Sequence, residues 1–193
     1  MATVPFPLDG SVLIVGPSQV GKTTMTAEAL DGWIAAHGAA GVVVLDFAPE
    51  YEAEGRILGG RITRFTTVPN EAWHGVLEAH APRAQSEGVT EEAVRLAGDN
   101  AARAVELLRA APRPPRAVFV NDATIPFQHE RGDPAELLAY CDRADVAVLN
   151  AFDSDELGIE DPVSWLERRT LAAFRRWADR VVELPRGDEE RPV

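Results

Sequence analysis

The chain has 193 residues, 46% of them hydrophobic, so it is long enough to form one compact domain with a sizeable core. Its formal net charge is -12, which argues against a nucleic-acid or anionic-membrane partner, because such partners need a basic surface. One cysteine excludes an intramolecular disulfide and fits a reducing cytoplasm, where we expect the protein to reside.

Targeting and metal-binding segments are not expected either. The chain does not open with a basic segment followed by a long apolar run, and no apolar stretch reaches membrane-spanning length. The four histidines lack metal-ligand spacing, which argues against a structural zinc site.

The first half of the chain begins with a regular alternation of elements. Apolar runs predict buried strands at 11–15 and 41–47, with an amphipathic helix at 22–37 between them. A short strand is predicted at 61–65 and a helix at 71–80.

The second half continues this pattern. Thr90 is predicted to cap a long helix that ends at the proline-rich segment 111–116. Asp133 and Asp161 are predicted to cap two further helices. Three more strands are predicted at 117–122, 145–150 and 180–184.

Strands that alternate with helices predict an α/β fold, with a doubly wound, mainly parallel five-stranded sheet and helices on both faces. We expect residues 1–184 to form a single domain and 185–193 a flexible tail. Residues 48–115 then form a helical insertion between the second and third strands, serving as a lid or as a substrate or partner surface.

A glycine-rich turn joins the first strand to the first helix. Its sequence GPSQVGKT fits the pattern G-x-x-x-x-G-K-[ST], in which backbone N–H groups and a helix N-terminus surround phosphate oxygens. The residues expected to contact a nucleoside triphosphate are Gly16, Pro17, Ser18, Gln19, Val20, Gly21, Lys22, Thr23 and Thr24. Lys22 is the only lysine of the chain, and its slender ammonium suits the β and γ phosphates better than the planar fork of arginine.

This turn resembles the Walker A motif of the P-loop NTPase superfamily. The resemblance implies that Thr23 gives its hydroxyl to Mg²⁺ and that a carboxylate at a nearby strand end completes the metal site. Asp122 looks like this Walker B residue, and Asp46 then orients water or an acceptor hydroxyl; the two roles can also be exchanged. No glutamate follows Asp122, which favours the kinase–GTPase division, where the Walker B strand lies next to the phosphate-loop strand.

Weaker signals surround these residues. Glu50, Glu52 and Arg56 are candidates for an acceptor pocket, with a solvated loop as the alternative. His129 and Arg131 follow the third strand, where Arg131 is a candidate phosphate contact but more simply a surface arginine.

The fourth strand ends in the sequence NAFD. Asn150 and Asp153 match two positions of the guanine-binding pattern N-K-x-D, but alanine replaces its lysine. Asn150 is therefore also a candidate polar residue near the γ phosphate.

The chain is also faintly similar to adenosylcobinamide kinases, in the stretches EAEGRILGGRI, NDATIPF and ADRVVELPRG. That family carries a histidine after strand two that accepts a nucleotidyl group. Here Gly59 and Gly60 stand in the corresponding stretch, so the resemblance does not extend to nucleotidyl transfer.

The sequence thus predicts an enzyme that cleaves the β–γ bond of ATP with Mg²⁺, with catalytic residues Lys22, Asp46 and Asp122. The acceptor is water or a small molecule, and the arginines of 48–115 are compatible with an anionic one. Two alternatives stay open: a nucleotide-dependent switch that acts on a protein partner with slow hydrolysis, and a GTP-binding protein.

Overall fold

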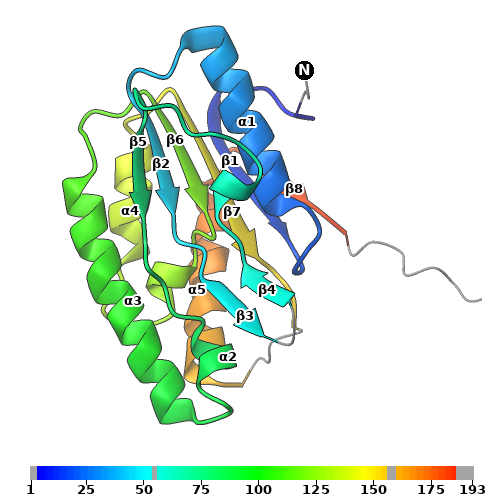
Figure 1. The fold of residues 1–193 in the computed structure, drawn as a ribbon, viewed down its shortest axis with the longest axis vertical. Helices are drawn as coiled ribbons and strands as arrows, with labels where there is room; N and C mark the ends of the chain where they lie inside the picture. The colour runs from blue at the N-terminus through cyan, green and yellow to red at the C-terminus, as the bar shows by residue number, and fades with distance from the viewer. Residues whose placement is uncertain (1–3, 54–55, 156–159, 186–193) are drawn as a thin grey trace, which may run out of the picture.

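The computed structural model describes residues 4–53, 56–155 and 160–185, without the side chains of residues 53 and 56–58. At its centre lies a six-stranded sheet in the order β5-β2-β6-β7-β1-β8, with every pairing parallel (Figure 1). The strands are β1 (Gly10–Gly16), β2 (Val42–Asp46), β5 (Trp73–Val76), β6 (Ala117–Asn121), β7 (Val146–Phe152) and β8 (Arg180–Glu183).

Helices flank this sheet, and a small hairpin stands apart from it. The α-helices are α1 (Lys22–His37), α2 (Pro82–Gln85), α3 (Thr90–Ala110), α4 (Pro134–Cys141) and α5 (Pro162–Trp177), and the 3₁₀ turns are η1 (Ile62–Arg64) and η2 (Ile125–Phe127). The antiparallel hairpin consists of β3 (Glu50–Ala53) and β4 (Arg56–Gly59).

Two hydrophobic layers sandwich the sheet. Successive side chains of a strand point to opposite faces, so each strand contributes to both layers. Leu13 and Val15 of β1 belong to the layer that contains α3, α4 and α5, whereas Val12 and Ile14 belong to the layer that contains α1. The prediction of a doubly wound α/β fold with helices on both faces is therefore confirmed.

The sheet has one strand more than expected, because the helix predicted at 71–80 is wrong. This segment contains β5, which pairs with β2 at the edge of the sheet. Gly75 disfavours a helix and lets the backbone pass close to its neighbours, since a Cβ there would lie 2.3 Å from the Trp73 ring. The strand predicted at 61–65 is instead the 3₁₀ turn η1, whose buried Ile62 packs in the α1 layer.

The strand order differs from the one that the kinase–GTPase division implies. Strand β6, which precedes Asp122, pairs with β2 and β7, and β7 separates it from the phosphate-loop strand β1. The expected neighbourhood of these two strands is therefore wrong.

Two of the three predicted helix caps are observed. Asp133 accepts a hydrogen bond from the Ala135 N–H and Asp161 accepts one from the Ser164 N–H, both at 2.9 Å, so these two predicted caps are confirmed. Thr90 is the first residue of α3 rather than its cap, and Val89 at the cap position has no side-chain oxygen to offer. In the described ranges, no helix is both long enough and apolar enough to cross a membrane.

Candidate functional site

The turn after β1 is tight and contains left-handed backbone conformations. Gly21 has a φ of 94° and Gln19 a φ of 61°, so two of its residues adopt the left-handed conformation. Gly16 lies so close to the C-terminal part of the chain that a Cβ would come within 2.5 Å of the Leu184 carbonyl oxygen. Glycine is thus required at two of the positions that the sequence pattern specifies.

The N-terminus of α1 faces this turn without a cap. No side chain caps α1, and its first turn contains no acidic residue. The first N–H groups of a helix have no partner inside the helix, and together with the helix dipole they favour a bound anion. The end of α1 is therefore suited to a phosphate group.

Lys22 lies at the same end of α1 and is only 7% exposed. Its Nζ donates a hydrogen bond to the Pro17 carbonyl oxygen, so the side chain folds back over the loop. The Nζ also lies 5.9 Å from the centre of the Phe152 ring at the end of β7. The ammonium is thus held within the loop, next to the cavity described below.

Three neighbouring strands carry a polar residue at or near their carboxyl ends, on the face that α1 covers. The sequences VVVLD, AVFVN and VAVLN each alternate so that the fifth residue shares a face with the first and the third. These residues are Asp46, Asn121 and Asn150, and all three are fully buried. The period of two therefore gathers them under the first turns of α1.

Asn121 is the centre of a hydrogen-bond network among these residues. Its Oδ1 accepts hydrogen bonds from Thr23 Oγ1 at 3.1 Å and from Asn150 Nδ2 at 2.9 Å. Its Nδ2 donates to Asp46 Oδ1 and to the Gly60 carbonyl oxygen, each at 2.9 Å. Every polar atom of this buried amide is engaged, so its orientation is fixed.

The network connects α1 to the segment that follows the hairpin. Asp46 Oδ2 accepts a hydrogen bond of 2.8 Å from the Ile62 N–H of η1. Asn150 Nδ2 also donates to Thr26 Oγ1, which in turn donates to the Lys22 carbonyl oxygen of α1. Strands β2, β6 and β7 thus hold both the phosphate loop and the inserted segment.

Asp122 differs from these network residues, although it follows Asn121 directly. Its φ of 53° turns the chain, and its N–H donates to Asn150 Oδ1 at 3.0 Å. Asp122 lines the cavity. Burial raises the pKa of Asp122 to about 6; nearby Lys22 opposes this rise, and Glu167 and Asp46 add to it.

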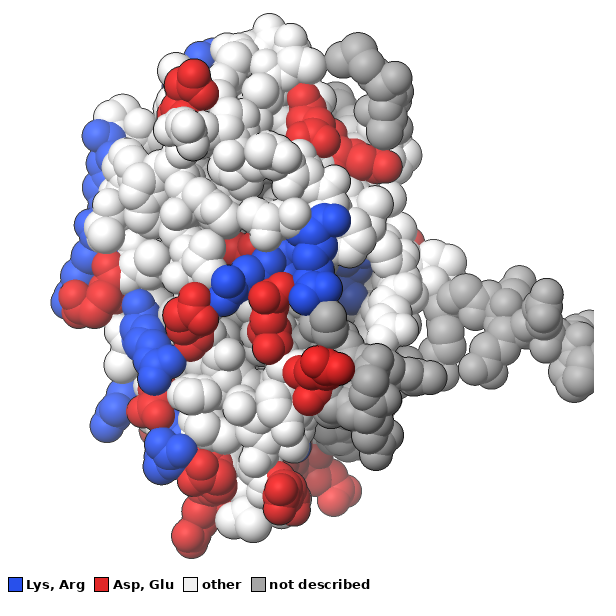
Figure 2. Space-filling model, viewed as in Figure 1, with Lys and Arg blue, Asp and Glu red and all other residues white. Residues whose placement is uncertain are grey.

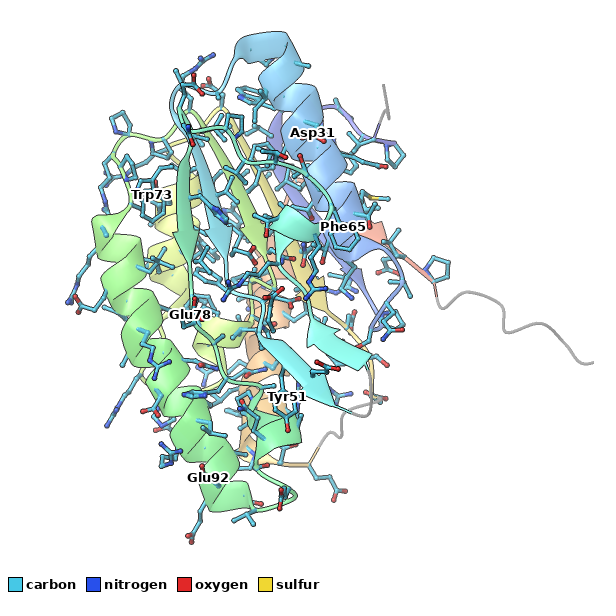
Figure 3. The ribbon with its side chains drawn as sticks, in the orientation of Figure 1. Asp31, Tyr51, Phe65, Trp73, Glu78 and Glu92 are labelled. Carbon is cyan, nitrogen blue, oxygen red and sulfur yellow. The ribbon has the colours of Figure 1, made fainter. Side chains whose placement is uncertain are left out.

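The cavity lies at the carboxyl end of the sheet and has a volume of about 460 Å³. This is within the usual range of about 300–1,000 Å³ for small-molecule sites. On one side it is lined by Ser18, Gln19, Gly21, Lys22, Thr23 and Thr24. Phe65, which lies beside α1 in Figure 3, and residues of α2 and η2 line other parts of it.

An ion pair that the sequence analysis missed supports the wall opposite the loop. Arg83 of α2 contacts Glu167 of α5 at 2.6 Å, and Glu167 is only 4% exposed. Thr124 and Gln128 also donate to Glu167, at 3.0 and 2.9 Å. The sequence did contain a signal for this cluster, because Glu167 lies among apolar residues on one face of α5, between Val163 and Phe174.

Of the other predicted residues, Glu50, Glu52, His129, Arg131, Asn150 and Asp153 are not part of the cavity wall. Glu50 forms ion pairs with Arg64 and Arg61, and its hydrogen bond with Arg64 lowers its pKa. Glu52 is exposed, and the side chain of Arg56 is outside the described part of the chain.

The candidates after β6 and β7 are also engaged elsewhere. His129 Nδ1 accepts a hydrogen bond from the N–H of Arg131, whose side chain is exposed. Asp153 pairs with Arg175 at 2.6 Å, which leaves it poorly disposed to bind a guanine edge.

Comparison with protein-family models and with curated proteins found no match.

Replacing Glu167 by alanine should destabilise the fold. The change leaves Arg83 in a mostly buried position without its carboxylate, and breaking such a pair costs about 3–5 kcal/mol. Urea unfolding followed by circular dichroism measures this loss. Glu106→Ala is the matched control, since Glu106 pairs with Arg109 on the surface and its loss should cost less than about 1 kcal/mol. Equal effects of the two changes would contradict the structural role of Glu167.

Replacing Asp122 by asparagine should stabilise the fold in a pH-dependent way. Because the folded pKa of Asp122 is raised from 3.8 to about 6, the stability that its proton confers is present below about pH 4 and is lost as pH rises through about 6. At about pH 8, the free energy of unfolding of Asp122→Asn should therefore be about 1–3 kcal/mol larger than that of the wild type. The difference should shrink toward about pH 4. A difference that does not change with pH would contradict the raised pKa.

Proposed function

We propose that the chain binds Mg·ATP through residues 16–24 and cleaves its β–γ phosphate bond. The observation that carries this proposal is the uncapped N-terminus of α1, which meets the left-handed turn and the buried Lys22 at one wall of a cavity. Backbone N–H groups and one ammonium are the donors that a polyphosphate requires. The strand order separates the proposal from the kinase–GTPase division and leaves the wider resemblance to P-loop NTPases as its basis.

The residues near Thr23 fit a magnesium ion that is held mainly by phosphate. Mg²⁺ prefers oxygen ligands and keeps several waters, so it is usually bound by few protein groups together with substrate phosphates. Thr23 lines the cavity and supplies one neutral oxygen, its Oγ1, which Asn121 Oδ1 orients from 3.1 Å away. No group of three or more His, Cys, Asp or Glu side chains within the described ranges forms a metal cage. When bound, the metal neutralises charge that develops on the phosphates.

Asp122 is better suited than Asp46 to accept a proton. Both oxygens of Asp46 accept hydrogen bonds inside the network, and the residue is not part of the cavity wall. The Asp122 carboxylate faces the cavity, and a pKa near 6 matches a general base at neutral pH. We therefore assign Asp122 to the attacking water or hydroxyl, and Asp46 to the support of Asn121.

In this reaction the attacking oxygen forms a bond to the γ phosphorus, and the bond from that phosphorus to the β–γ bridging oxygen breaks. The electron pair leaves on ADP, and the proton of the attacking group passes to Asp122. Lys22 stabilises the charge on the phosphates.

A nucleotide-dependent switch is the second candidate, and one specific observation favours it. The amide of Asn121 contacts both Thr23 in the phosphate loop and the Gly60 carbonyl oxygen after the hairpin. A Thr23 hydroxyl that turned toward a metal would release one of these contacts, so the inserted segment would respond to the bound nucleotide.

Mg·ATP should raise the thermal midpoint of the wild type, because a ligand of the folded state stabilises it by mass action. Lys22→Ala should weaken ATP binding about 10- to 100-fold, the cost of a lost charged hydrogen-bonding group. Titration calorimetry measures the affinity, and ADP formation should fall with it. Mg·GTP and the two diphosphates, run in parallel, test the choice of base and the contribution of the γ phosphate.

Arg131→Ala is the matched control, because it removes one exposed cation outside the cavity and should leave ATP affinity unchanged. Wild-type affinity in Lys22→Ala, or no thermal response to any nucleotide, would refute the proposed function.

A further inference from the structure

We propose that the part of the cavity opposite the phosphate loop binds an uncharged, largely apolar alcohol as the phosphate acceptor. This inference rests on the proposed function and specifies the acceptor that the same site takes. We call this part of the cavity the outer wall, and it consists of Ala81, Pro82, Ala84, Ile125 and Gln128.

Apolar side chains dominate the outer wall. Ala81, Pro82 and Ala84 belong to α2 and the residue before it, and Ile125 belongs to η2. Two separate elements thus contribute aliphatic groups to one space, and Phe152, which ends β7 beside the loop, also lines the cavity. Such a surface binds the apolar body of a ligand, since it gains free energy by removing that body from water.

The cations around the outer wall are already neutralised. Arg83 is held by Glu167 at 2.6 Å, and Arg64 is held by Glu50 at 2.8 Å. Lys22 faces the phosphate loop, where the triphosphate requires it. An acceptor with a carboxylate or phosphate of its own would therefore meet no uncommitted cation among these residues, and it would lie near the Asp122 carboxylate.

The same pairing extends to other arginines of the inserted segment, which argues against an anionic acceptor. Arg61 pairs with Glu78, and Arg95 pairs with both Glu92 and Asp99. In Figure 2 the basic side chains near the middle of the face accordingly lie beside acidic ones. The arginines hold the segment together rather than form an anion pocket.

One polar atom of the outer wall has no hydrogen-bond donor among the described residues. Gln128 is 2% exposed and gives its Nε2 hydrogen to Glu167, but its Oε1 accepts no hydrogen bond from a described residue. Buried acceptors are normally satisfied, so this atom favours a ligand or water with an O–H group. An alcohol supplies such a group and also the oxygen that attacks the γ phosphorus. Its reaction gives a phosphate monoester, ADP and one proton, by the bond changes described above.

Benzyl alcohol and benzoate test this inference, because they share a ring and differ in charge and in the hydroxyl donor. Binding is measured by saturation-transfer NMR with Mg²⁺ and a non-hydrolysable ATP analogue present, so that the phosphate loop is filled. We expect benzyl alcohol to bind at least about ten-fold more tightly than benzoate, a difference of about 1.4 kcal/mol. Equal or tighter binding of benzoate, or no binding of benzyl alcohol, would overturn the inference.

A variant locates the binding. Ala84→Trp fills the outer wall from the half-buried face of α2 and should reduce benzyl alcohol binding at least about ten-fold. Ala102→Trp adds the same side chain at an exposed position of α3 outside the cavity and should have no effect. Benzyl alcohol binding that survives Ala84→Trp would overturn the inference. If Ala84→Trp does not fold, the wild-type comparison of the two probes still decides.

The thermal response to the nucleotide analogue distinguishes a failure of the acceptor inference from a failure of the proposed function. A wild type that shows a thermal response to the analogue, yet binds benzoate as well as benzyl alcohol, contradicts only the acceptor class. A wild type without a thermal response to the analogue contradicts the proposed function itself.

Discussion

The N-terminus of α1 must lie over the ends of β2, β6 and β7, and the rest of the site depends on this constraint. A helix start that no side chain caps has unsatisfied N–H groups and a positive dipole end, so it needs either water or an anion there. The polar residues near these strand ends fix its position through Asn121, which bonds to Thr23. Were Asp46 or Asn150 apolar, the amide of Asn121 would be left partly unpaired in a buried layer, at a cost of about 1–3 kcal/mol.

Lys22 in the loop differs in its contacts from the arginines around the cavity. The chain is strongly acidic, and several arginines of the inserted segment pair with carboxylates of β3, α3, α5 and the segment after β5. Lys22 also donates a hydrogen bond to the Pro17 carbonyl oxygen, and it lies close enough to Asp122 to oppose the rise in the pKa of that carboxyl. The pairing of Arg64 and Arg83 with carboxylates is the reason for proposing an uncharged acceptor at the outer wall.

Much of the fold could be predicted because local and tertiary preferences agree. The apolar runs of β2, β6 and β7 are buried on both faces, as strands inside a doubly wound sheet must be, and Asp133 and Asp161 cap their helices through purely local bonds. Strand β5 was missed because a four-residue edge strand has little periodicity of its own, and its hydrogen bonds come from β2.

The site was predicted unevenly for a related reason. The phosphate loop is contiguous in sequence, whereas the Arg83–Glu167 pair joins residues 83 and 167, whose proximity only the fold determines. Asn121 has no motif of its own and was not predicted, although the alternation of β6 directs residue 121, and not residue 122, toward α1.

The most direct test of the central claim is the response of the loop's own backbone to Mg·ATP. In ¹H–¹⁵N spectra of the labelled protein, we predict that the amides of residues 18–24 move downfield on titration, because phosphate oxygens accept their hydrogens. Gly21 and Lys22, at the start of α1, should be among the most affected. Unchanged amides in the loop, with shifts confined to other parts of the molecule, would contradict the account.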